Sequence, residues 1–336
     1  MGLLALVAGC DQGEPAPERA EGPPLGLVAT YPLDGAGLEC PLDAPPECGV
    51  PLNAPIELRF DRVLLPSTAT RQSIVIYTGS PNNQPGAGGS DVLQPTYDLV
   101  ERVVSYRLPE GKGLAPSTLY TVELPVPVED GDVGFRAFDE APLAATRLPL
   151  RFSFFTSAVE ESATPAEPVP DSSEVLTFFS TNPGQGACSN CHNSERAPQG
   201  LDLSTGNALL ATAIGRVAHQ TDLGITTGAV LENPSRMGID MPIIDPGRPD
   251  NSYLLYKLIV RPENYRRSAS DPDLCGSAYR VAEDETCLPP SEPERARLRE
   301  WFVRGEPMPL TEPDIALDRE RLQAIQRFIR AGAECD

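Results

Sequence analysis

An acidic, proline-rich segment at residues 158–172 constrains the fold most, because it separates two stretches with different hydrophobic patterns. Before it, short runs rich in Val, Ile, Tyr and Phe alternate with clusters of Pro, Gly, Asn and Asp. After it, apolar residues recur at helical spacing. The 336 residues include 37 Pro and 28 Gly, which favours turn-rich β structure and linkers over one long helical protein.

Residues 27–157 are predicted to form a β-sandwich, because short β-rich runs separated by turn residues are typical of that architecture. The expected strands cover 56–60, 74–77, 103–106, 119–124 and 152–156. Three pieces of this region, 50–62, 114–124 and 152–157, resemble the bacterial Ig-like domains of surface proteins. The resemblance implies an antiparallel sandwich. We interpret Glu129, Asp130 and Asp132 as a solvated turn rather than a calcium site.

Residues 173–336 are predicted to form short helices joined by long loops. Ser173 and Ser204 are expected to cap the first two helices, and 254–259 presents one apolar face. Ser291 with Glu294 three residues later makes a capping box for a fourth helix. A last helix is expected to stop at Gly332.

The segment Cys188-Ser189-Asn190-Cys191-His192 carries the chemistry, because C-x-x-C-H is the attachment site of c-type haem. Residues i and i+3 of a helical turn face the same way, so both sulfurs can reach the two vinyl groups of one porphyrin. The adjoining imidazole then lies beneath the iron. A thioredoxin-like redox pair would need a βαβ setting, and structural zinc would need a second ligand pair. The pattern therefore favours one haem c, with another metal, or a disulfide or inert pair, as weaker alternatives.

The segment 173–336 resembles the single-haem cytochrome c domains of bacterial cell-envelope proteins. The matching pieces are 188–192, 200–204, 245–258, 308–309 and 328–333, with 262–290 as an insertion. Together with the Ig-like resemblance of residues 27–157, this resemblance implies the fold class of the whole chain. That class is an Ig-like antiparallel β-sandwich followed by a small all-α cytochrome c-like domain. The cytochrome c resemblance also implies that Met308, followed by Pro309, is the second axial ligand of the iron. Met241, in a second Met-Pro pair, is the main alternative.

Two other residues are weaker candidates for the second axial ligand of the iron. Met237 is read as structural or exposed, because buried methionine is more often filler than ligand. His219 is read as a surface histidine. An iron with His and Met ligands has no vacant position for a substrate, which favours one-electron transfer over catalysis.

The segment Val7-Ala8-Gly9-Cys10 resembles the bacterial lipoprotein signal. The resemblance implies a signal at 1–10, lipidation of Cys10, a flexible tether at 11–26 and a location in the cell envelope, with the body in the periplasm or at the cell surface. The remaining cysteines are expected to pair as Cys40–Cys48 and Cys275–Cys287. Cys335 is left over, and it could instead pair with either member of the second pair. Disulfides and covalent haem both indicate an oxidising compartment.

The charge balance narrows the class of partner. Lys and Arg total 27 against 48 Asp and Glu, giving a net charge of −21. A surface this negative repels the phosphate backbone of nucleic acid, which excludes a nucleic-acid partner. We therefore expect a membrane-anchored electron carrier that meets redox proteins, with the β region as spacer or docking module. The alternatives are a surface scaffold or adhesion protein with a non-essential haem, and a haem-dependent oxidoreductase subunit.

Overall fold

The computed structural model describes residues 22–41, 45–79, 93–129, 132–161, 168–179, 188–219, 221, 240–265, 288–301, 303, 305–308 and 317–335. The strands within these residues are β1 (Leu25–Tyr31), β2 (Ile56–Phe60), β3 (Val75–Thr78), β4 (Gln94–Asp98), β5 (Val103–Arg107), β6 (Leu119–Glu123), β7 (Leu143–Ala144) and β8 (Arg151–Phe155). The α-helices are α1 (Ser172–Phe179), α2 (Gly206–Thr212), α3 (Tyr253–Ile259), α4 (Glu292–Trp301) and α5 (Arg319–Arg330).

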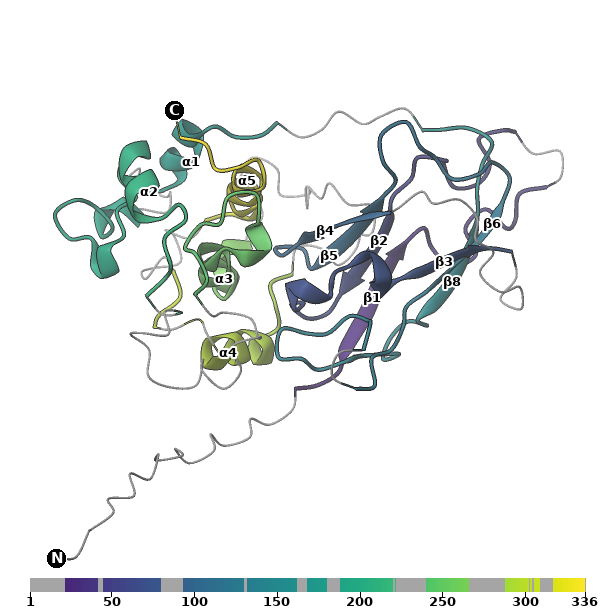
Figure 1. Ribbon diagram of the computed structural model, residues 1–336, viewed down its shortest axis with the longest axis horizontal. Helices are drawn as coiled ribbons and strands as arrows, with labels where there is room; N and C mark the ends of the chain where they lie inside the picture. The colour runs from purple at the N-terminus through teal and green to yellow at the C-terminus, as the bar shows by residue number, and fades with distance from the viewer. Residues whose placement is uncertain are drawn as a thin grey trace, which may run out of the picture.

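The strands form two sheets (Figure 1). One has five strands in the order β4-β5-β2-β1-β7, and the other has three in the order β3-β6-β8. Among these described strands, neighbours run antiparallel except β1 and β7, which run parallel. Every residue of the central strand β2 is buried, as expected for a strand covered on both faces.

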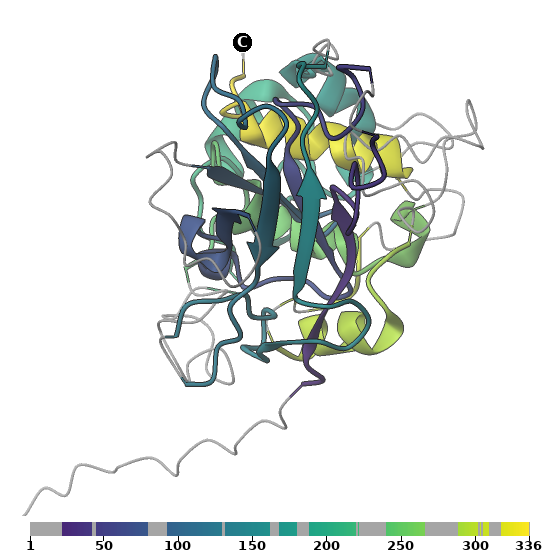
Figure 2. The ribbon, with the colours of Figure 1, turned by 90° about the vertical axis from the view of Figure 1, so that its right-hand side faces the viewer.

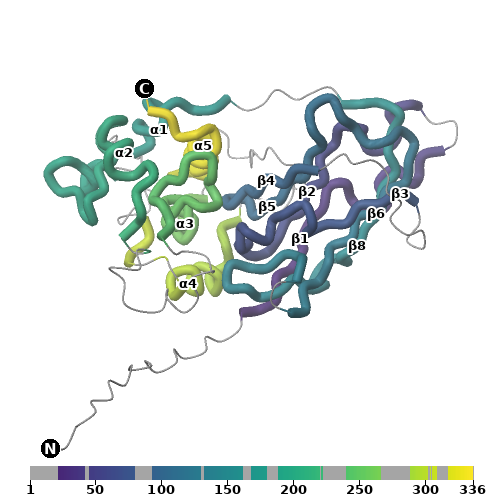
Figure 3. The backbone as a smooth tube through the Cα atoms, in the orientation of Figure 1, coloured from purple at the N-terminus to yellow at the C-terminus, as the bar shows by residue number. Residues whose placement is uncertain are grey.

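The helices gather at the end of the molecule opposite β3, β6 and β8, as the tube in Figure 3 shows. Helix α5 lies beside the β4–β5 end of the larger sheet, and a second view agrees (Figure 2). Helix α3 is the centre of this helical half, because all seven of its residues are buried. One cluster of buried hydrophobic side chains includes residues of the strands and of all five helices.

The fold class expected from the sequence, an Ig-like antiparallel sandwich followed by a small all-α cytochrome c-like domain, is wrong. The described residues form a mixed α/β structure of two sheets and five α-helices with a shared core, and no all-α cytochrome c-like domain is evident among them. The parallel pairing of β1 with β7 also departs from a purely antiparallel sandwich.

Buried polar contacts between helices and sheet explain the difference. Gln326 of α5 accepts hydrogen bonds from the backbone N–H groups of Leu99 and Val100, at 3.1 and 3.3 Å. Glu294 of α4 accepts one from the guanidinium of Arg62 at 2.7 Å. In a hydrophobic pattern, polar residues such as these are assigned to the solvent-facing side of a helix. The pattern therefore does not show that α4 and α5 pack on the sheet.

Helix starts differ slightly from the expected caps. The side chain of Asp171, rather than Ser173, accepts the N–H of Glu174 in α1. Thr205 caps α2 by accepting the N–H of Ala208. Asp, Ser and Thr have similar preferences for the N-cap position, so a helix can begin one or two residues away from the expected position.

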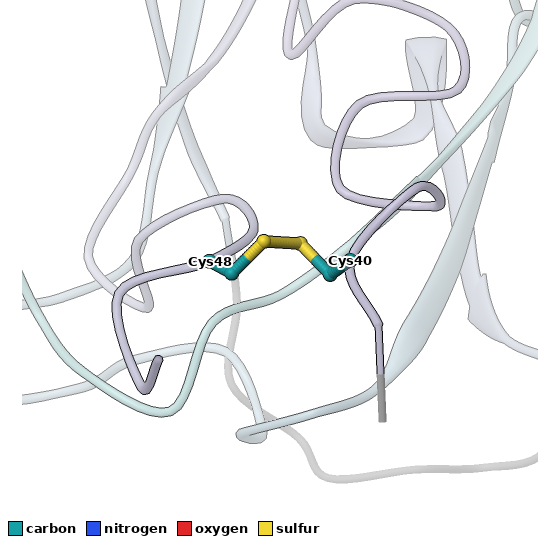
Figure 4. The surroundings of a disulfide bond; sticks show 2 residues. All are labelled: Cys40 and Cys48. Atoms are coloured by element: carbon teal, nitrogen blue, oxygen red, sulfur yellow. A yellow bond between two sulfur atoms is a disulfide. The ribbon is translucent and has the colours of Figure 1, made fainter. Parts of the chain in front are cut away.

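A disulfide joins Cys40 to Cys48, the first pair expected from the sequence (Figure 4). The segments on either side of the disulfide lie against the outer edge of β8, where the N–H of Phe155 donates to Ala36 and the N–H of Val50 donates to Phe155. Gly49 has a φ of +110°, and a Cβ there would come within 2.8 Å of the Ser157 nitrogen. These segments therefore cover an edge strand that would otherwise be open to pairing.

Removing this disulfide should lower stability moderately. For a sequence separation of 8, the chain-entropy treatment gives a loss of about 2.5 kcal/mol in the double variant Cys40→Ser/Cys48→Ser. Urea unfolding of the oxidised and reduced protein, compared with the double variant, measures it. An unfolding midpoint unchanged by reduction would contradict the expectation.

Candidate functional site

The C-x-x-C-H segment forms a single tight turn. A 3₁₀ helix covers Cys188–Asn190, and the N–H groups of Cys191 and His192 both donate to the carbonyl of Cys188, at 3.2 and 2.8 Å. Side chains three residues apart eclipse one another in a 3₁₀ helix, so both sulfurs lie on one side of the turn. Cys191 is exposed and Cys188 is partly buried against the core. This arrangement fits attachment of both sulfurs to one porphyrin.

The ring of His192 is oriented by the backbone. Its Nδ1 lies 3.3 Å from the carbonyl oxygen of Leu201. A carbonyl only accepts hydrogen bonds, so Nδ1 carries the proton and Nε2 keeps its lone pair for a metal. Burial lowers the pKa of His192, the bond to Leu201 opposes this, and the charge of Lys257 adds to the lowering. The lowered pKa favours the neutral imidazole, the form that binds a metal.

A residue that the sequence analysis missed holds the carbonyl of Leu201 in place. The hydroxyl of Thr212 in α2 accepts the N–H of Asp202 and lies 3.0 Å from the carbonyl of the same residue. The N–H of Leu203 donates to the carbonyl of His192 at 2.9 Å. Metal-binding histidines are commonly oriented in this way by a second layer of contacts. No local pattern marks Thr212, because its partner lies ten residues away.

The raised pKa of Cys188 favours its protonated thiol at neutral pH. Burial is the main cause that raises this pKa to about 12; Cys191 contributes to the rise, and a backbone hydrogen bond and Arg261 oppose it. A protonated, half-covered thiol is a poor nucleophile. This disfavours Cys188 as the attacking thiol of a thioredoxin-like redox pair.

Two cations at the C-terminal half of α3 act electrostatically on the turn. Lys257 of α3 is close enough to lower the pKa of His192, and Arg261, just after the helix, acts on Cys188. Burial lowers the pKa of Lys257 to about 8, opposed by Glu306. A Cβ added at Gly305 would lie 3.7 Å from the Lys257 Nζ, so the 305–308 segment also runs along this part of α3.

Met308 is held at the same end of α3. Its carbonyl accepts a hydrogen bond of 3.0 Å from the Nδ2 of Asn264, and the same nitrogen donates to Leu258 at 2.9 Å. The side chain of Met308 is partly buried against the hydrophobic core. Asn264 was missed because it falls in the segment read as an insertion.

Met241 lies toward the other end of α3. Its side chain is 3% exposed in the core, and its carbonyl accepts from the N–H of Ala218. The next carbonyl, that of Pro242, accepts from Tyr253 at the start of α3. His219 is exposed, in agreement with the surface role expected for it.

Several predicted residues lie outside the described part of the chain: Cys10, Asp130, Met237, Cys275, Cys287 and Pro309. Of the acidic turn, the described residues show Asp132 accepting the N–H groups of Val128 and Glu129. No group of three His, Cys, Asp or Glu side chains is placed to hold a metal ion among the described residues. Likewise, none of the described helices has the length and apolarity needed to cross a membrane.

Comparisons with known proteins add little. No family model matches the chain, and no curated protein matches it. One solved structure with weak similarity is the N-terminal part of the bacterial S-layer protein SbsC. The TM-score is 0.23 and the identity 12%, over 40% of this chain and 24% of that one. The chain thus spans about a quarter of that structure, and a match at this level carries no argument about fold or function.

Proposed function

We propose that this chain is a c-type cytochrome that passes single electrons through one haem c. Thioether bonds from Cys188 and Cys191 would hold the porphyrin, and His192 and Met308 would be the axial ligands. The haem supplies a one-electron Fe(III)/Fe(II) couple when bound. The observation that carries the proposal is the turn at Cys188–Asn190, with a histidine whose Nδ1 faces a carbonyl and whose Nε2 is left for iron.

The surroundings favour Met308 over Met241 as second ligand. Met308 is held at the C-terminal end of α3, and Lys257 in the same half of that helix acts electrostatically on His192. Met241 is packed in the core beside the start of that helix. A thioether ligand favours Fe(II) and closes the iron to substrates, which suits a carrier rather than a catalyst.

The larger sheet would serve as a rigid support for the haem-binding half, since helices α4 and α5 hydrogen-bond to residues just after its strands β2 and β4. Within the proposal, Cys10 anchors the protein by lipid to a membrane of the cell envelope, with the body outside the cytoplasm. The Cys40–Cys48 disulfide agrees with an oxidising compartment. The net charge of −21 would attract a basic redox partner.

The test is expression with a cytochrome c maturation system, followed by intact-mass analysis and the spectrum of the reduced, denatured protein in alkaline pyridine. We expect the mass of one haem and two thioether links. Cys188→Ser and Cys191→Ser should each leave one link, and the double variant should leave none. Cys335→Ser is the matched control and should keep both links.

Electron transfer is checked on the loaded protein. An optical redox titration should give a reversible one-electron couple, and carbon monoxide should bind the reduced protein slowly. Wild-type protein that leaves the maturation system without covalent haem would refute the proposal. Rapid carbon monoxide binding would point to an open iron site and an oxidoreductase instead.

A further inference from the structure

Asn264 makes three side-chain hydrogen bonds beside the end of α3. It is fully buried, at 0% exposed, in the 3₁₀ turn Pro262–Tyr265 that follows α3. Its carboxamide offers two N–H donors and one carbonyl acceptor, and the described residues engage both kinds of group. A buried amide without these partners would destabilise the core, so the contacts define its position.

The end of α3 and two residues more than 40 positions further along the chain meet at this amide. Its Nδ2 donates to the carbonyl of Leu258 at 2.9 Å and to that of Met308 at 3.0 Å. Its Oδ1 accepts the N–H of Leu317 at 3.0 Å, just before α5 begins. The end of α3, the residue Met308 and the approach to α5 are therefore tied to one side chain.

The contact with Met308 is made through its backbone, which leaves the thioether available. Of the chain's methionines, Met308 is the one bonded at the end of α3 among the described residues. Thioether sulfur is a weak ligand for haem iron, particularly in the oxidised state. If the segment around Met308 had to become ordered each time its sulfur bound the iron, the lost conformational entropy would offset much of the free energy of that bond.

We propose that Asn264 is the positioning residue that holds Met308 at the second axial position of the iron, and so keeps that position closed to outside ligands. The inference rests on the proposed function, because it presumes a haem at Cys188 and Cys191. It deepens that function by naming what decides between a closed electron carrier and an open, ligand-binding iron.

The test uses the full chain matured with haem, and compares wild type with Asn264→Leu, Asn264→Ser and Met308→Ala. We expect all four to carry covalent haem in the pyridine spectrum. The sulfur-to-iron charge-transfer band of the oxidised wild-type protein should vanish in Met308→Ala and weaken at least tenfold in the Asn264 variants. Carbon monoxide should bind those variants rapidly. The Fe(III)/Fe(II) equilibrium should shift at least tenfold toward Fe(III), which is 59 mV for one electron.

A matched control separates positioning from a general loss of fold. Asn53 is exposed and exchanges two hydrogen bonds of 2.9 Å with the backbone of Glu161 on the β half, so Asn53→Leu makes the same substitution outside the helical half. It should leave the charge-transfer band unchanged. Far-ultraviolet circular dichroism scores the folding of each variant.

Each outcome decides a different point. A folded Asn264 variant that keeps the full sulfur-to-iron charge-transfer band overturns the inference. Failure of both Asn264 variants to fold also overturns it, because Asn264 would then stabilise the whole core. A Met308→Ala protein that keeps the band refutes Met308 as ligand. A wild-type protein lacking covalent haem refutes the proposed function itself.

Discussion

Above about pH 10 the protein should unfold in one steep step, because four buried tyrosines must keep their protons for the fold to persist. These residues are between 0% and 7% exposed: Tyr97, Tyr106, Tyr256 and Tyr265. Burial is the largest cause that raises the pKa of each hydroxyl. Their ionisation therefore strongly favours the unfolded chain.

The hydrogen bonds of these hydroxyls add a second reason. Tyr256 donates to the carbonyl of Asp250 at 2.7 Å, and Tyr265 donates to that of Val100 at 3.0 Å. A phenolate would face each carbonyl oxygen without a proton between them. Removing the proton thus turns two buried attractions into repulsions.

The sign and size follow from linkage. The folded-state pKa lies above the unfolded value of about 10, so the stabilisation is complete below pH 10 and is lost as the pH rises beyond it. Each such group costs about 1.4 kcal/mol per pH unit, and four cost about 5–6 kcal/mol per pH unit. A typical stability of about 5–15 kcal/mol would be exhausted within one to three units.

Tyrosinate absorbance and circular dichroism, followed together against pH, measure the effect. The two signals should change in the same narrow interval. In Tyr256→Phe the slope of unfolding free energy against pH should fall by about a quarter. Gradual ionisation of these four tyrosines with the fold intact at about pH 12 would contradict the prediction.

The second large effect is expected at the ion network between α4 and the sheet. Arg62 donates to Asp139 and to Glu294, each at 2.7 Å, and Arg297 also pairs with Asp139. The side chains of Arg62, Asp139 and Glu294 are 5% exposed or less. Arg62→Met would leave two buried carboxylates with one cation. Breaking such a network by removing one partner costs about 3–5 kcal/mol.

The pH dependence of this loss has a definite sign. Burial raises the pKa of Glu294, and Arg62 is the main opposing influence. Without Arg62 the carboxyl would take up a proton at higher pH, and a neutral acid needs no cation. The difference in stability between wild type and Arg62→Met should therefore be largest near neutral pH and shrink as the pH falls through the acid range.

Urea unfolding followed by the fluorescence of Trp301 measures this directly. Trp301 is the chain's single tryptophan and contacts Phe138 and Arg297 beside the network. Arg248→Met is the matched control, because its pair with Asp245 spans 4.0 Å and Arg248 is 62% exposed. It should cost less than about 1 kcal/mol. Equal losses in the two variants would show that the buried network does not hold α4.

Much of the local structure could be predicted from the sequence. The five expected strands correspond to β2, β3, β5, β6 and β8, and the expected helices correspond to α1 to α5 within a few residues. Ser291 does accept the N–H of Glu294, as the capping box requires. The carboxylate of Glu294, however, turns to Arg62 and to the N–H of Val63 instead of back to the cap.

The prediction of the fold class failed because residues of the helices hydrogen-bond to partners far away in the sequence. Glu294 and Arg62 are 232 residues apart, and Asn264 and Met308 are 44 apart. Tyr265, at the start of the segment read as an insertion, donates to Val100 at the edge of the sheet. A hydrophobic pattern contains no information on such partners, so it did not indicate the mixed α/β structure in which helices and sheets contribute to one core among the described residues.

The sequence alone determined the periodicities that make strands and helices, the close cysteine spacing that permits a disulfide, and the Cys-x-x-Cys-His turn, because each depends on residues within about ten positions. Only the tertiary structure decided that the helices pack on the sheet and that Asn264 lies between α3 and Met308. Those outcomes depend on desolvation and complementary hydrogen bonding between distant segments, which exist only once the chain has folded.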